Sequence, residues 1–171
     1  EANPDDAAAC NNLAWQYVTA PAALDDGKAA LPLAEKAVRL ESKNAVYRNT
    51  LGVAYYRVGR YREAVEVLRA NLDRDQDWAR AFDLYFLAMS HHHLGDSTQA
   101  RDYYDWASRW PRTHPRLSAG HLEELTLFRA EAAALLRIDM MTTPESGPVV
   151  EPKAAGGALP SSKAPPATKD G

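Results

Sequence analysis

Identical residues recur along this sequence at a nearly constant interval. Three pairs stand 36 positions apart: Leu51 and Leu87, Gly59 and Gly95, and Ala64 and Ala100. Ala30 marks an earlier copy, because it precedes Ala64 by 34 positions. Intervals of this size are typical of repeat proteins, in which each copy is one small unit that must stack on its neighbours to bury its apolar face. The sequence therefore predicts a short repeat array.

Each copy divides into two segments whose apolar residues recur at helical spacing. The first segment should run to about Thr19, and the others should cover about 27–40, 44–58, 61–72, 78–94, 97–109 and 118–138. Asn44, Asp96 and Ser118 stand where side chains cap the N-terminus of a helix. We therefore predict seven helices and no strand.

Small residues occupy equivalent places in the copies. They are Ala14, Gly52 and Ala88 on the first helices, and Ala30, Ala64 and Ala100 on the second helices. Small side chains allow two helix axes to approach closely, while larger neighbours fill the surrounding grooves. We expect these positions to hold each helix pair together.

Composition excludes several classes of function. The formal charge of −3 offers no basic footprint for nucleic acid. No apolar run reaches the length of a membrane span. A single cysteine, Cys10, cannot form an internal disulfide, which favours a cytoplasmic location, and we expect it to be a buried or half-buried thiol rather than a nucleophile.

The chain divides into an array with a capping helix, residues 1–140, and a tail, residues 141–171. From residue 142 onward the sequence holds six of the eleven prolines and four of the nine glycines, and no aromatic residue. Such a segment buries too little apolar surface to offset its ordering entropy. The tail, rich in Pro, Gly, Ala and Ser, is therefore predicted to be disordered.

The repeated residues resemble tetratricopeptide repeats, a family whose unit is a 34-residue helix–turn–helix. The second copy carries the motif best, in Leu51, Gly52, Tyr55, Gly59, Tyr61, Ala64 and Leu68. The likeness covers roughly 4–110, and 117–138 is similar to the extra helix that caps such arrays. Arg48 departs from the tryptophan that usually opens the unit. The resemblance implies an all-α, right-handed α-α superhelix that acts as a non-catalytic protein-interaction scaffold.

The amino-acid sequences of several segments also resemble C-terminal repeats of large bacterial signalling proteins. Some of those proteins carry a serine/threonine kinase domain or WD40 propeller repeats. That likeness implies an alternative role, the recruitment or regulatory segment of a multidomain signalling enzyme. The chain itself has no glycine-rich phosphate loop and no His-Arg-Asp or Asp-Phe-Gly motif.

In arrays of this family the first helices line a concave groove that receives a protein or peptide partner. The residues expected to line it are Asn11, Trp15, Asn49, Val53, Tyr56, Arg57, Tyr85, Met89, His92 and His93. The aromatic residues offer the contact area of binding hot spots, and the two amides suit the backbone of an extended peptide. Arg57 is the one fixed positive charge of the set. We expect about half of these residues to be exposed.

Three consecutive histidines, 91–93, raise the question of a metal site. Successive residues on a helix point about 100° apart, so these three side chains cannot converge on one ion. We expect His91 to face the partner helix and His92 and His93 to line the groove. The sequence therefore predicts no metal ion, no cofactor and no catalytic residue, and it leaves the oligomeric state open.

Overall fold

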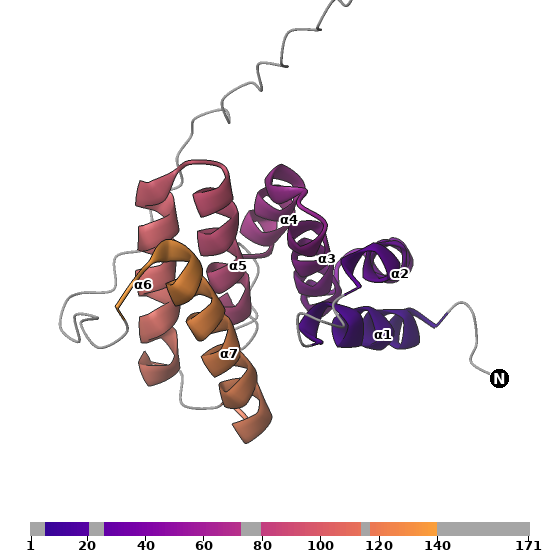
Figure 1. Cartoon of the computed structure of the whole chain (residues 1–171). Helices are drawn as coiled ribbons and strands as arrows, with labels where there is room; N and C mark the ends of the chain where they lie inside the picture. Colours follow the sequence, from indigo (N-terminus) through magenta and orange to yellow (C-terminus); the bar gives the residue numbers. More distant parts are fainter. Residues whose placement is uncertain (1–5, 21–25, 73–79, 114–116, 140–171) are drawn as a thin grey trace, which may run out of the picture.

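The computed structural model describes residues 6–20, 26–72, 80–113 and 117–139 of the chain. These residues form seven helices and no strand: α1 Ala7–Thr19, α2 Gly27–Leu40, α3 Ala45–Arg57, α4 Tyr61–Leu72, α5 Arg80–His93, α6 Ser97–Thr113 and α7 Ala119–Leu136 (Figure 1). The all-α prediction is confirmed. The predicted tail, 141–171, lies outside the described residues.

Side chains cap the N-termini of the helices, as the sequence predicts. Asn44 accepts a hydrogen bond from the backbone N–H of Val46 at 3.1 Å, and Ser118 accepts one from His121 at 3.2 Å. Asp96 likewise accepts from the N–H of Gln99 at 3.1 Å. Each cap satisfies a backbone donor that the helix itself leaves unpaired, which sets where the helix begins.

The recurring glycines form the turn between the two helices of a pair. Gly59 has a φ of 79° and Gly95 a φ of 82°, a left-handed conformation that other residues adopt only at a cost. In each case the glycine follows the first helix of a pair, and the next residue donates its N–H to a carbonyl oxygen of that helix. Arg60, for example, donates to Tyr55 O at 2.9 Å. The interval of 36 residues is thus the distance between two equivalent turns.

Each helix packs on its successor, so the pairs α1–α2, α3–α4 and α5–α6 stack in a row (Figure 1). The first helices of the pairs, α1, α3 and α5, also contact one another in sequence, whereas the second helices do not. The last helix, α7, packs on α5 and α6. This arrangement is the predicted solenoid. None of the described helices combines the length and apolar composition needed to cross a bilayer.

Gly52 of α3 and Leu68 of α4 approach each other closely within the second pair. A Cβ atom at position 52 would come within 2.5 Å of Leu68 Cγ, and closer still to one of its methyl groups. Leu68 is fully buried, and so are the neighbouring small residues Ala54 and Ala64. Packing in protein interiors is as dense as in organic crystals, so the added atom has no void to enter.

We expect Gly52→Ala to destabilise the protein by about 1–3 kcal/mol, because the overpacking cost exceeds the gain in helix propensity of about 1 kcal/mol. Gly120→Ala is the matched control. It lies on α7, where the nearest neighbour of an added Cβ is Ser118 Oγ at 4.0 Å. Urea unfolding should show opposite signs for the two variants, and equal stability of Gly52→Ala and the native chain would contradict the contact.

Candidate functional site

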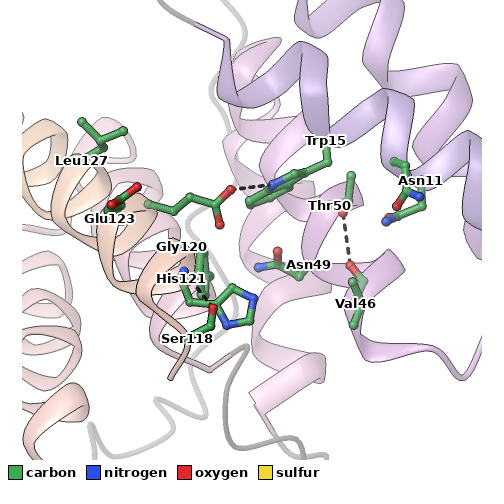
Figure 2. A pocket seen from close by; sticks show the side chains of 13 residues that line it. Asn11, Trp15, Val46, Asn49, Thr50, Ser118, Gly120, His121, Glu123 and Leu127 are labelled. Atoms are coloured by element: carbon green, nitrogen blue, oxygen red, sulfur yellow. Dashed lines mark hydrogen bonds between the residues drawn. The ribbon is translucent and has the colours of Figure 1, made fainter. Parts of the chain in front are cut away.

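A groove lies between α1 and α3 on one side and α7 on the other, and Phe82 of α5 also lines it. Two interactions cross it. The indole N–H of Trp15 donates to Glu124 at 3.1 Å, which Figure 2 shows, and the guanidinium of Arg57 forms two hydrogen bonds with the carboxylate of Glu131, one of them at 2.9 Å. Bidentate arginine–carboxylate pairs are among the strongest polar contacts in proteins. Through them α7 forms one wall of the groove as well as a cap on the array.

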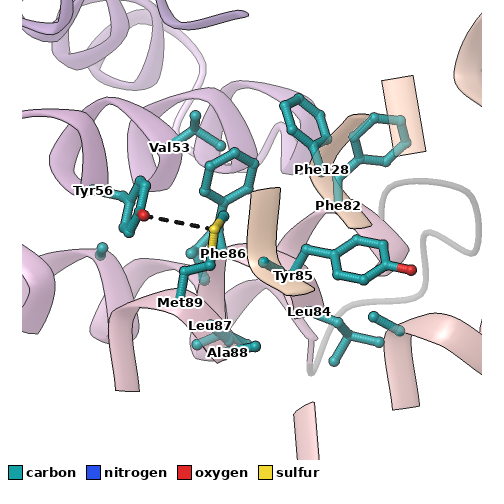
Figure 3. Packing of buried hydrophobic residues seen from close by; sticks show 14 of the residues in the cluster. Val53, Tyr56, Phe82, Leu84, Tyr85, Phe86, Leu87, Ala88, Met89 and Phe128 are labelled. Carbon is teal, nitrogen blue, oxygen red and sulfur yellow. Dashed lines mark hydrogen bonds between the residues drawn. The ribbon is translucent and has the colours of Figure 1, made fainter. Parts of the chain in front are cut away.

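Rings from three helices fill the middle of the groove. The aromatic cluster consists of Trp15, Phe82, Phe86 and Phe128. Phe128 of α7 lies 6.1 Å from Trp15, 5.9 Å from Phe82 and 4.9 Å from Phe86, measured between ring centroids, with the rings edge to face. Figure 3 shows Phe82, Phe86 and Phe128 gathered in this way. The cluster closes the groove at its centre.

The ten groove residues of the sequence analysis are more buried than expected. Six are buried: Asn11, Asn49, Val53, Tyr56, Tyr85 and Met89. Trp15, Arg57 and His92 are partly buried, and His93 is exposed. Packing of α7 into the groove and of α3 against α5 accounts for the difference.

Two of the buried groove residues show where their side chains go instead. The ring of Tyr85 packs 6.0 Å from that of Tyr104, so it turns towards α6 and away from Asn11 and Trp15. The hydroxyl of Tyr56 donates to the sulfur of Met89 at 3.5 Å, and burial raises the pKa of Tyr56 (Figure 3). Both side chains are part of the core.

The histidines point in different directions, as expected. His91 is buried and stacks on Tyr103 of α6, with ring centroids 5.3 Å apart, and burial lowers its pKa. His93 stacks on Tyr61 of α4 at 4.2 Å. Within the described parts of the chain, no three His, Cys, Asp or Glu side chains come together as metal ligands would.

A buried polar cluster that the sequence analysis missed lies beneath the groove. Asp83 of α5 is buried, and its two carboxylate oxygens accept hydrogen bonds from the amides of Asn49 and Asn71, each at 2.8 Å. Asn71 also donates to Ala45 O at 3.1 Å. Burial raises the pKa of Asp83 to about 7, against the opposing effects of the two amides and the Arg80 charge. The asparagine at position 71, where the repeat motif has a small alanine, was the available signal.

The groove remains open at one end, where a pocket of about 600 Å³ lies between α1, α3 and the first turns of α7 (Figure 2). Asn11, Trp15 and Asn49 line it, three of the residues that the sequence predicts. His121 and Glu124 of α7, which the sequence analysis did not include, line it from the opposite side. Only the tertiary position of α7 brings them there.

One polar atom in this pocket is unsatisfied. Asn11 is only 4% exposed, yet its side-chain carbonyl oxygen Oδ1 has no hydrogen-bond partner among the described residues. An unpaired buried acceptor costs about 1–3 kcal/mol, so such atoms usually have a partner. Asn11 is among the residues that line the pocket.

Residues 24–107 match a family model described as anaphase-promoting complex, cyclosome, subunit 3. The matched segment contains α2 to α5 and most of α6, and so most of the stacked pairs described above. The chain is a tetratricopeptide-type repeat protein. Tetratricopeptide-type repeats generally mediate protein interactions. No curated protein matches this repeat protein.

The raised pKa of Asp83 predicts that the stability of the protein depends on pH. Because the pKa of Asp83 is raised from 3.8 to about 7 in the folded state, its contribution to stability is present at low pH and is lost as the pH rises through about 7. The free energy of unfolding should therefore fall between about pH 5 and about pH 8, by an amount on the order of 1–3 kcal/mol.

Asp83→Asn should remove this part of the pH dependence, because the amide does not titrate. Asp102→Asn, an exposed aspartate on α6, is the matched control. Chemical unfolding of the three proteins at both pH values measures the difference. Parallel pH profiles for the native chain and Asp83→Asn would contradict the assignment.

Proposed function

We propose that this tetratricopeptide-type repeat protein is a non-catalytic interaction module that binds a peptide of a partner protein in the groove between α1 and α3 on one side and α7 on the other. The observation that carries the proposal is the open pocket with the unpaired Asn11 oxygen beside an indole ring. A protein pocket that combines apolar rings with a few well-placed polar groups is typical of a binding site.

The residues of the groove divide into two roles in this proposal. Asn11 accepts a peptide N–H, while Trp15 and Phe82 supply the apolar area on which a side chain of the partner rests. Buried residues such as Tyr56 and Met89 do not touch the partner and instead hold the wall in place. His92 and His93 are not among the residues that line the pocket, and His93 stacks on Tyr61 of α4.

A role as the recruitment segment of a multidomain bacterial signalling enzyme is a further proposal that uses the same groove. It rests on the sequence likeness given above. Reading the gene on both sides of the coding region for this segment tests it, because a neighbouring kinase or propeller domain in the same frame is required.

The groove proposal is tested by selecting displayed peptides on the full chain and measuring their affinities for two variants. Asn11→Leu removes the unpaired oxygen at similar volume, and Leu127→Ala truncates a pocket residue that is 68% exposed. Each substitution should weaken the binding of the selected peptides about 3- to 10-fold, which corresponds to the loss of one hydrogen bond or one apolar contact.

Leu40→Ala is the control for this experiment. Leu40 is an exposed leucine at the end of α2, and it is not among the pocket residues. The affinity of the Leu40→Ala variant for the selected peptides should equal that of the native chain. Peptides that bind all three variants equally well would place the binding site elsewhere.

A further inference from the structure

We propose that the pocket binds a positively charged side chain, an arginine or lysine of the partner peptide. This inference rests on the proposed function and names the chemistry that the pocket recognises. It follows from three properties of the pocket: its charge, its rings and its hydrogen-bonding groups.

The charge of the pocket is negative. Glu123 and Glu124 of α7 both line it, and no lysine or arginine is among its described lining residues. Arg57, the positive charge that the sequence analysis assigned to the groove, is held by Glu131 further along α7. A carboxylate ligand would meet two like charges with no counter-charge in the pocket, whereas a cation would meet complementary ones.

The rings of the pocket suit a cation as well as an apolar group. Trp15 and Phe82 lie edge to face with their centroids 6.1 Å apart, and both line the pocket. The hydrogen bond from the indole N–H to Glu124 fixes the orientation of the Trp15 ring. Indole faces attract guanidinium and ammonium groups more strongly than the other aromatic rings do.

Three side chains of the pocket offer oxygen acceptors to a ligand. Asn11 presents its unpaired oxygen, and the two glutamates present carboxylates. Two donor groups of the lining are already engaged: the Asn49 amide bonds to Asp83, and the Thr50 hydroxyl donates to Val46 O at 3.2 Å. An arginine carries five N–H donors and a lysine three, and neither carries an acceptor.

The volume of the pocket, about 600 Å³, is within the range of sites that enclose a ligand. It accommodates a long basic side chain together with part of the adjoining peptide backbone. Because the pocket lies at the open end of the groove, the rest of the peptide can continue along the surface of α7 and α3. The pocket would then select one residue of the partner.

The test uses the full, ¹⁵N-labelled chain and the indole N–H resonance of Trp15, assigned with a Trp15→Phe variant. Three peptides are titrated: acetyl-Gly-Ala-Arg-Ala-Gly-amide, its lysine analogue and its citrulline analogue, which has the shape of arginine without the charge. The arginine or the lysine peptide should shift the resonance saturably at millimolar or lower concentration, and the citrulline peptide should bind about tenfold more weakly, a difference of about 1.4 kcal/mol.

Charge-removing variants show whether the two glutamates are responsible. Glu123→Gln and Glu124→Gln should each weaken the binding of the basic peptide about 3- to 10-fold. The Glu124→Gln side chain keeps an oxygen that can accept the hydrogen bond of the Trp15 N–H. Glu66→Gln, at an exposed position on α4, is the control with the same change in net charge and should leave the affinity unchanged.

Equal binding of the arginine and citrulline peptides, or no shift of the Trp15 resonance up to about 10 mM peptide, would overturn the inference. The proposed function has a separate outcome. If peptides selected by display contain no basic residue and still need Asn11 and Leu127, the groove binds a partner and only the charge preference is wrong.

Discussion

Leu68 occupies the space that a side chain at position 52 would need, and the rest of the structure depends on this contact. It brings the axes of α3 and α4 close together, and the fully buried Ala14, Ala30 and Ala88 act in the same way in the neighbouring pairs. Close axes allow one pair to cover the apolar face of the next, which no pair could bury alone. The stack then presents α1, α3 and α5 along one side, where the groove lies.

Helix α7 supplies much of the charge and part of the aromatic surface of the groove. This helix contributes Phe128 to the aromatic cluster, Glu131 to the pairing of Arg57, and Glu124 to the wall of the pocket. Without it the guanidinium of Arg57 would lose its carboxylate partner, and the aromatic cluster would lose Phe128. With it the centre is closed, the positive charge is neutralised, and the open end is acidic. The helix that caps the array therefore also determines the charge and the shape of the groove.

Asn49 links the wall of the groove to the core, because it lines the pocket and donates to the buried Asp83. Burying a carboxyl group is costly, and the amides of Asn49 and Asn71 offset part of the cost. Since these hydrogen bonds require α3, α4 and α5 to meet in one register, they also specify how the second pair sits on the third. Stability and the shape of the pocket are thus coupled through one residue.

The sequence by itself determined the helices, their turns and their pairing. Capping residues such as Asn44 and Ser118, left-handed glycines and small residues at a constant interval act over a few positions, so local physical chemistry is sufficient to read them. It also identified Asn11, Trp15 and Asn49 as neighbours. Only the tertiary structure decided that Tyr85 turns towards α6, that Glu131 takes Arg57, and that Glu124 faces Trp15. Those contacts join residues up to 109 positions apart, and their geometry depends on how α6 and α7 dock on the array, which no local pattern encodes.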